Sequence, residues 1–178
     1  TVVVKILLPQ FLDNKKFVKR FEREAQTLSK INHPHLLTVY DYGVYGVNYP
    51  YIVTEFVPGV PLYEIIEEKG RIPLDETVEI LSQVCDGLHT AHQQGITHRD
   101  MKPDNILVTR EEQQEWIKVI DFGLAVDSPE GQTRLTDAGS LIGTAAYMAP
   151  EQFERMGADV DARTDVYALG VIFYEMLT

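Results

Sequence analysis

The sequence is poor in cysteine, in basic residues and in long apolar runs. Its only cysteine, Cys85, cannot form an internal disulfide, so we expect a reducing compartment and a small buried side chain at this position. No apolar run approaches the roughly 20 residues that cross a bilayer. Repeats and low-complexity tracts are also absent. These absences exclude a disulfide-stabilised scaffold and a repeat protein, and they predict no membrane segment within these residues.

The charge balance is acidic, with 16 Lys and Arg residues against 27 Asp and Glu residues and a net charge of −11. Such a surface disfavours nucleic acid and anionic membranes as main partners. Metal-bound phosphates remain compatible with it, because Mg²⁺ is held by carboxylates. Solubility is the plainer explanation of the acidity. The 44% hydrophobic and 24% charged residues are otherwise typical of a soluble globular protein, and 178 residues suffice for one domain.

The first third of the chain has the pattern strand, helix, strand, strand. A β-branched run predicts a strand over residues 1–8, and two more strands are expected over 36–42 and 51–57. Asn32-His33-Pro34 ends the helix between them. Pro58-Gly59 breaks the pattern, and we place a boundary there. The helix is indicated by apolar residues at spacings of three and four, namely Phe17, Phe21, Ala25, Leu28 and Ile31.

Helices dominate the remainder. We expect a short helix over 62–69, and a long one with Asp75 as its N-cap and Gly95 past its end. A hairpin is predicted with strands over 106–109 and 116–120, and a last helix over 165–177. Residues 124–146 lack periodicity, and a loop of that length is usually functional or disordered. The apolar faces expected for the long and the last helix are Val78, Leu81, Val84, Leu88 and Ala91, and Val166, Leu169, Phe173 and Met176.

Several short motifs follow one another in a fixed order. They are Val2-Val3-Val4-Lys5, His98-Arg99-Asp100-Met101-Lys102-Pro103-Asp104-Asn105, Asp121-Phe122-Gly123, Gly143-Thr144 and Ala149-Pro150-Glu151. Each could arise by chance, but the ordered set resembles the protein kinase signature across essentially the whole chain. Three softer features resemble the bacterial serine/threonine members of that family: Arg23-Glu24-Ala25, Asn32-His33-Pro34 and Tyr147-Met148-Ala149-Pro150-Glu151-Gln152.

The resemblance implies an α+β, bilobal protein-kinase-like fold. Residues 1–57 would form part of a small, mainly β N-lobe with one helix, and residues 58–178 part of a larger, mainly α C-lobe. The family's Gly-rich loop, which covers the phosphates, would precede the strand that bears Lys5, and further helices would follow Thr178. We therefore expect the isolated 178 residues to bind ATP weakly or not at all, and to be weakly active or inactive. The parent protein is expected to be cytoplasmic, or to place this part in the cytoplasm ahead of a membrane anchor.

The resemblance also assigns catalytic roles, and these suit the chemistry of the residues. Asp100 would accept the proton of the substrate hydroxyl, and Lys102 would contact the γ-phosphate as a point charge. Asn105 and Asp121 would hold Mg²⁺ through hard oxygen donors. Thr144 would bridge Asp100 and Lys102. Taken singly, each residue also has a plainer interpretation: Asp100 as a turn residue, and Lys102 as a solvated surface lysine.

The nucleotide would lie between Lys5 and the segment 51–57. Lys5 would contact the α- and β-phosphates and pair with a glutamate of the following helix. We favour Glu24 over Glu22, which falls on the face away from the apolar residues. The implied adenine contacts are Thr54 as gatekeeper, the backbone of Glu55 and Val57 as hydrogen-bond partners, Leu107 below the ring and Val3 above it. Val3 departs from the family's usual alanine and narrows the roof of the pocket.

Regulatory and structural roles are implied as well. Arg99 would receive a phosphorylated activation loop, with Thr136 or Ser140 as the expected autophosphorylation site and Thr133 as an outsider. They could equally be ordinary loop residues. Asp165 would brace the backbone of the catalytic loop. The resemblance also makes His98 a packed residue and not a proton shuttle, because it matches the family's stacked apolar spine. The matching residues are Leu28, Val39, Phe122 and His98.

Three functional classes compete. An ATP- and Mg²⁺-dependent protein kinase is the leading interpretation, and Lys102 together with residues 143–147 favours serine/threonine over tyrosine specificity. A pseudokinase that acts as a binding scaffold is the alternative, although Lys5, Asp100, Asn105 and Asp121 are all present. A small-molecule kinase is disfavoured by the long segment that ends in Ala149-Pro150-Glu151, because that segment forms a platform for protein substrates.

Overall fold

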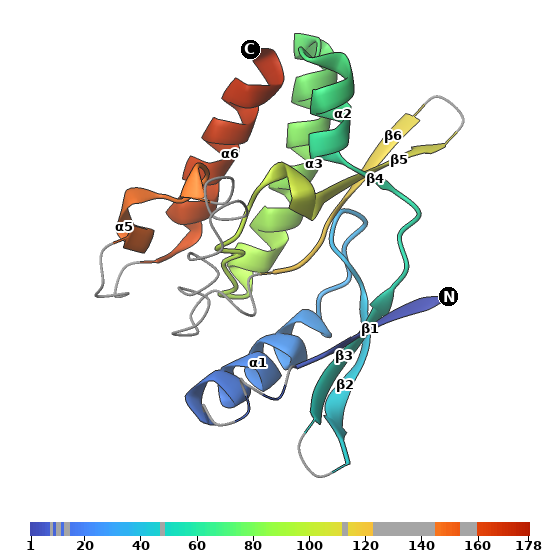
Figure 1. Ribbon diagram of the computed structural model, residues 1–178, viewed down its shortest axis with the longest axis vertical. Helices are drawn as coiled ribbons and strands as arrows, with labels where there is room; N and C mark the ends of the chain where they lie inside the picture. Colours follow the sequence, from blue (N-terminus) through green and yellow to red (C-terminus); the bar gives the residue numbers. More distant parts are fainter. Residues whose placement is uncertain are drawn as a thin grey trace.

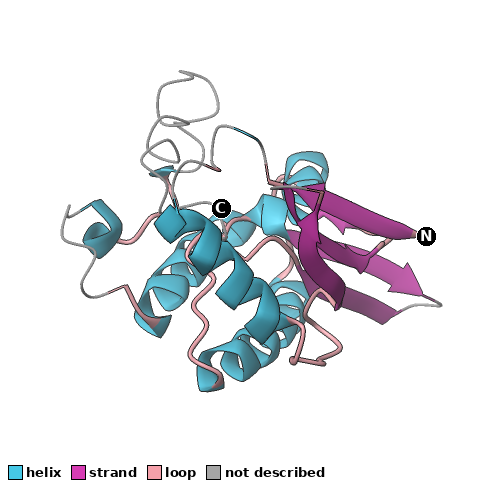
Figure 2. Cartoon of the chain, turned by 90° about the horizontal axis from the view of Figure 1, so that it is seen from below, coloured by secondary structure: helices cyan, strands magenta, loops and turns pink. Residues whose placement is uncertain are grey.

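The computed structural model describes residues 1–7, 9, 12, 15–46, 49–111, 114–122, 145–153 and 160–178. Within them, a three-stranded sheet with one helix lies beside a larger, mainly helical part that carries a second three-stranded sheet. Figure 1 shows the first sheet and helix α1 at one end of the molecule and helices α2, α3 and α6 at the other. Figure 2, seen from below, shows most strands on one side of the view and most helices on the other. The α+β class expected from the sequence is confirmed.

The first sheet is antiparallel, with β3 (Tyr49–Glu55) between β1 (Val2–Ile6) and β2 (Val39–Tyr45). Lys5 lies opposite Ile52 in this sheet, and Val3 lies opposite Thr54. Because side chains alternate along a strand, Val3 and Lys5 share one face of β1. Helix α1 (Lys15–Leu28) packs against the sheet through a small core formed by Leu7, Phe21, Ala25 and Ile52.

The helical part is built around two long helices in contact, α3 (Leu74–Gln93) and α6 (Ala162–Leu177). Strands β5 (Ile106–Glu111) and β6 (Gln114–Val119) form the predicted hairpin, and the short β4 (Val60–Pro61) pairs with β5. The described residues of this part also form the short helices α2 (Leu62–Lys69) and α5 (Pro150–Phe153) and the 3-10 helix η2 (Pro103–Asn105). Within the described ranges, no helix has the length and apolar character needed to cross a membrane.

The segment 35–37 connects the two parts through β6. The backbone N–H of Leu37 donates to the carbonyl of Val119 at 3.0 Å, and the N–H of Val119 donates to the carbonyl of His35 at 2.9 Å. Leu36 forms a parallel bridge with Val119. Gly87 of α3 allows this approach, because a Cβ atom there would lie 2.9 Å from the side chain of Leu36 and 3.1 Å from the carbonyl oxygen of His35.

Several details of the sequence prediction were wrong. Helix α3 begins at Leu74 with Pro73 as its N-cap, so Asp75 lies in the first turn, where its charge still suits the helix dipole. Val78 is 50% exposed and Val166 is 64% exposed, although both were expected on buried faces. Both helices carry apolar residues on several sides, so periodicity alone could not select the buried stripe. Cys85 is also exposed.

Candidate active site

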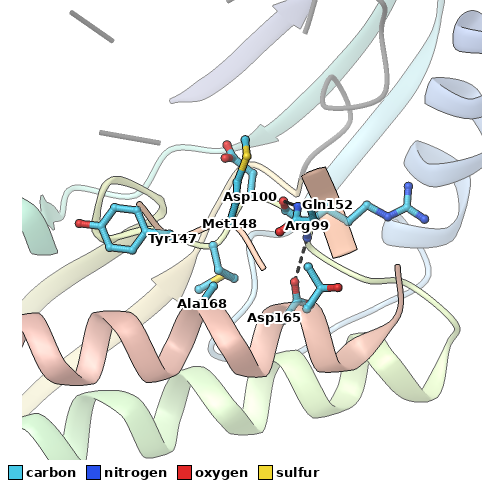
Figure 3. A pocket seen from close by; sticks show the side chains of 9 residues that line it. Arg99, Asp100, Tyr147, Met148, Gln152, Asp165 and Ala168 are labelled. Atoms are coloured by element: carbon cyan, nitrogen blue, oxygen red, sulfur yellow. Dashed lines mark hydrogen bonds between the residues drawn. The ribbon is translucent and has the colours of Figure 1, made fainter. Parts of the chain in front are cut away.

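One buried carboxylate binds the backbone at the start of the segment 98–102. Asp165, in the first turn of α6, is 1% exposed. Its two oxygens accept the backbone N–H groups of His98 and Arg99, each at 2.8 Å, and Oδ2 also lies 2.7 Å from Nε2 of His92. Arg99 has a φ of 67°, a left-handed conformation that costs a non-glycine residue about 1–3 kcal/mol. The predicted bracing role of Asp165 is confirmed, and Figure 3 shows its bond to Arg99.

Asp100, Lys102 and Asn105 form one polar cluster. Nζ of Lys102 lies 3.4 Å from Oδ2 of Asp100. Nδ2 of Asn105 donates to the backbone carbonyl of Asp100 at 2.7 Å and lies 3.3 Å from Oδ2 of Asp100. The Asp100 carboxylate is only partly buried, so a substrate hydroxyl can approach it. These contacts orient a carboxylate and place a cation beside it, which is what acceptance of a proton next to a phosphate requires.

Lys5 and Asp121 form an ion pair although they are 116 residues apart in the chain. Both side chains remain about two-fifths exposed, at 43% and 44%. Partial burial lowers the pKa of the Lys5 ammonium. The backbone N–H of Ile120 donates to the carbonyl of Asn105 at 2.9 Å, which places Asp121 beside the cluster around Asp100.

His98 is fully buried and has a structural role. Its Nε2 lies 2.8 Å from the carbonyl oxygen of Ile120, and the N–H of Asp100 donates to its Nδ1 at 3.3 Å. These partners assign the proton to Nε2 in a neutral ring. Burial lowers the pKa of His98, against the opposing effect of Asp165 and the Ile120 carbonyl. The ring packs 4.7 Å from that of Phe122, which joins Leu28 in the main core.

The expected adenine segment runs from the end of β3 into the helical part. Thr54 is 3% exposed and faces Val3 across the sheet. The side chain of Glu55 accepts hydrogen bonds from Nζ of Lys118 at 2.7 Å and from the backbone N–H of Thr38 at 2.6 Å. Burial acts to raise the pKa of Glu55, but these hydrogen bonds outweigh it and lower that pKa. Val57 and Leu107 are both partly buried, and Leu107 lies in β5 opposite Lys118.

Some predicted residues lie outside the described part of the chain. They are Gly123 and Thr144, together with the candidate phosphorylation sites Thr133, Thr136 and Ser140. Glu24 lies in α1, but its side chain is outside the described part, so its pairing with Lys5 stays a prediction. The partner that the structure gives Lys5 is Asp121.

Other contacts at the site were not predicted. Gln152 of α5 donates from Nε2 to the backbone carbonyl of Arg99 at 2.7 Å, and its Oε1 accepts the N–H of Ala149 at 2.9 Å. Proline at position 150 with glutamine two residues later is typical of a helix start, and this signal could have predicted the hydrogen bond to Ala149 but not the one to Arg99. Glu151 accepts the hydroxyl of Thr164 at 2.8 Å. A small pocket, open to solvent, lies beside Asp100 and Gln152.

Tyr147 lies on the opposite side of this pocket from Gln152 (Figure 3). Its hydroxyl donates to Glu175 of α6 at 2.5 Å. Burial and this hydrogen bond strongly raise the pKa of Tyr147, so the phenol stays protonated. Tyr147 thereby ties the segment before α5 to the far end of α6.

The site fits Mg²⁺ held by few protein ligands. In the described residues there is no group of three or more His, Cys, Asp or Glu side chains that could enclose a metal ion. Asn105 uses its amide N–H₂ on Asp100, which leaves its oxygen as a hard donor. Asp121 offers a partly exposed carboxylate nearby. Mg²⁺ is commonly held by one or two such oxygens, with water and phosphate oxygens completing its shell.

A small sheet with one helix, a helical body and this constellation between them define the catalytic domain of a protein kinase. Residues 1–178 match the protein kinase domain family along their whole length, and the chain belongs to that family. The predicted kinase fold is thereby confirmed.

The chain is 41% identical over 180 residues to the serine/threonine-protein kinase PknB of Mycobacterium leprae, covering 99% of the chain and 28% of that protein. It is 40% identical over 177 residues to a probable serine/threonine-protein kinase of Clostridium acetobutylicum, covering 99% of the chain and 26% of that protein. The crystal structure of the PknI kinase domain of Mycobacterium tuberculosis superposes with a TM-score of 0.77 at 29% identity, covering 99% of this chain and 63% of that one. The chain thus spans about a quarter of the length of these curated relatives. Both curated relatives are bacterial and are named serine/threonine-protein kinases, so the predicted resemblance to that group is confirmed.

Proposed function

We propose that this domain transfers the γ-phosphate of ATP to serine and threonine hydroxyls of protein substrates. The observation that carries the proposal is the convergence of Lys5, Asp100, Asn105 and Asp121. Lys5 and Asp121 touch, Asn105 and Asp100 touch, and a backbone bond from the residue before Asp121 joins the two pairs. Lys5 and Asp121 are 116 residues apart in the chain, whereas Asp100 and Asn105 belong to one loop. Their meeting at one place supports a shared role in phosphate chemistry.

In the proposed reaction the substrate hydroxyl oxygen forms a bond to the γ-phosphorus, and the bond from that phosphorus to the β–γ bridging oxygen breaks. Asp100 accepts the hydroxyl proton, and its contacts with Asn105 and Lys102 hold it in place. Lys102 offsets charge on the transferred group, and Lys5 contacts the α- and β-phosphates. Mg²⁺, when bound by Asn105 and Asp121, supplies neutralisation of the phosphate charge.

The ATP requirement has independent support from one structural neighbour. Rad53 residues 1–466, solved in complex with AMP-PNP, superpose with a TM-score of 0.75 at 29% identity. We extend nucleotide binding to this chain, with Thr54, Glu55, Val57, Leu107 and Val3 around the adenine as proposed contacts. The division at residue 57, the pairing of Lys5 with Glu24 and the cytoplasmic location also remain predictions.

The test is phosphotransfer by the natural full-length protein. Radiolabelled ATP, Mg²⁺ and a serine/threonine peptide library are supplied to the wild type and to an Asp100→Asn variant. Wild-type incorporation that the variant reduces by a factor of about a thousand or more would support the proposal. Nucleotide binding without transfer in the wild type would support the pseudokinase alternative and refute the kinase. Mass spectrometry of the active protein tests the second expectation, which is phosphate at Thr136 or Ser140.

A further inference from the structure

The peptide group that joins Arg99 to Asp100 is held at both of its polar ends. Its carbonyl oxygen accepts Nε2–H of Gln152 at 2.7 Å. Its N–H donates to Nδ1 of His98 at 3.3 Å. This peptide is the last rigid plane before the Cα of Asp100, so its orientation helps to set the position from which the carboxylate extends. Figure 3 shows Gln152 beside Arg99, close to Asp100 and Asp165.

The same glutamine holds the segment that precedes α5. Its Oε1 accepts the N–H of Ala149 at 2.9 Å, and its backbone N–H donates to the carbonyl of Ala149 at 2.9 Å. One amide group therefore joins residue 149 to the catalytic loop, with its acceptor on one side and its donor on the other. A shift of the segment 145–149 would carry Gln152 with it and withdraw the donor from Arg99.

We propose that Gln152 is a positioning residue for phosphotransfer, which aligns Asp100 only when the segment 145–149 is seated against α5. The inference rests on the proposed kinase function. Arg99 needs such support, because its φ of 67° is unfavourable for a side chain with a Cβ atom. Asp165 holds the N–H of Arg99 and Gln152 holds its carbonyl, so the strained residue is fixed from both sides.

A simpler role for Gln152 is capping of α5. With Ala149 as the first residue outside the helix and Pro150 inside it, Gln152 has the position of a capping-box residue, and its bond to the N–H of Ala149 is that of a cap. A cap, however, does not require the donor to Arg99. The two roles use different atoms of one side chain, Oε1 for the cap and Nε2 for the catalytic loop, and a substitution can separate them.

Gln152→Glu is the decisive variant. The carboxylate keeps an acceptor for the N–H of Ala149, and glutamate is an equally good capping-box residue. It has no proton to donate to the carbonyl of Arg99 at neutral pH. We expect kcat to fall about tenfold, the effect of losing one hydrogen bond to a partly buried carbonyl. KM for ATP should stay within about twofold, since the nucleotide contacts do not include Gln152. The melting temperature should fall by a few degrees, because the carbonyl of Arg99 loses its donor.

The chain offers a matched control in Gln83. This glutamine also bridges two backbone segments: Nε2 donates to the carbonyl of Glu115 at 2.9 Å, and Oε1 accepts the N–H of Ile117 at 3.2 Å. It joins α3 to β6 and does not contact the catalytic loop. Gln83→Glu therefore imposes the same loss of a donor without the effect on Asp100. Its kcat should stay close to that of the wild type, whatever its melting temperature.

Steady-state kinetics of the natural full-length protein with Mg²⁺-ATP and a peptide substrate decide the matter. A loss of kcat in Gln152→Glu alone, at constant KM for ATP, supports the inference. A kcat within about twofold of the wild type, or an equal loss in Gln83→Glu, overturns it. Should Gln152→Glu fail to fold, Gln152→Met, which lacks both the donor and the capping acceptor, is compared with Gln83→Met, which loses the same two kinds of contact away from the catalytic loop, and the difference in kcat decides by the same limits. A wild type that transfers no phosphate overturns the proposed function itself, which distinguishes that failure from a failure of this inference.

Discussion

Replacement of Asp165 by asparagine tests how far the active site depends on one buried carboxylate. The change is nearly isosteric, so packing in α6 is retained. It replaces one acceptor oxygen by an N–H₂ group. Oδ1 serves the N–H of Arg99, and Oδ2 serves the N–H of His98 and the ring of His92. Whichever way the amide turns, at least one backbone N–H then faces another donor.

The orientation with the smaller loss places the amide nitrogen against Arg99 and keeps the oxygen on His98 and His92. One buried N–H then lacks an acceptor, which costs about 1–3 kcal/mol. The two remaining bonds lose their ionic character, and charge-assisted bonds are about twice as strong as neutral ones. We therefore expect the free energy of unfolding to fall by about 2–4 kcal/mol, a large part of the 5–15 kcal/mol typical of a domain.

Activity should fall further than stability explains. Without its bond to Asp165, Arg99 can leave its left-handed conformation, and displacement of a reacting group by about 1 Å can cost about a hundredfold in rate. We expect kcat to fall about a hundredfold under conditions in which the variant is still folded.

Urea denaturation gives the stability change, and phosphotransfer kinetics give the rate. The control is Asp161→Asn on the same helix, where Asp161 caps α6 by accepting the N–H of Arg163 at 2.9 Å. Asparagine caps as well as aspartate, so both quantities should stay near the wild type. An Asp165→Asn variant as stable and as active as the Asp161→Asn variant would refute the reasoning.

Three further predictions concern packing and pH. Gly87→Ala should destabilise the fold by about 1–3 kcal/mol, because the new methyl would lie 2.9 Å from the side chain of Leu36. Gly170→Ala has nothing within 4 Å of the new methyl and should stabilise the fold by up to about 1 kcal/mol, and thermal denaturation compares the two variants. Hydrogen bonds hold the pKa of Glu55 below its ordinary 4.5, so the carboxylate stabilises the fold above pH 4.5 and loses this effect as the pH falls through the lowered pKa. The difference in unfolding free energy between the wild type and Glu55→Gln should therefore shrink as the pH falls below 4.5. A difference that stays constant with falling pH would contradict this. Burial lowers the pKa of His98 below its ordinary 6.5, so the unfolded state takes up a proton before the folded state and the stability declines below pH 6.5. The urea midpoints at about pH 7.5 and about pH 5.5 should therefore differ more for the wild type than for His98→Phe. Equal differences would count against a buried neutral ring.

Much of this site was predictable from local sequence because its residues lie in short, ordered motifs. Asp100 and Asn105 are five positions apart, and the loop that carries them brings them into contact. The apolar residues before Asp121 likewise predicted a strand there, which is β6. Less was predictable where the partner lies far along the chain. The pairing of Glu55 with Lys118 and the double contact of Gln152 depend on how strands and helices meet.

Helix faces show the same limit. The periodicity of α3 and α6 correctly predicted two helices, but Val78 and Val166 proved exposed. A helix with apolar residues on several sides has more than one candidate stripe, and the choice is made by the neighbours that pack against it. Asp165 illustrates the point: a charged residue took a fully buried position because three donors converge on it there.

By itself, the amino-acid sequence determined the family of this protein, the order of its longer helices and strands, and the identity of the groups suited to phosphate chemistry. These follow from residue types and short-range spacing, which act before the chain is compact. Only the tertiary structure decided which groups touch. Lys5 meets Asp121, and Gln152 holds the peptide before Asp100, because the link between residues 35–37 and β6 and the packing of α3 against α6 bring distant segments within hydrogen-bond reach.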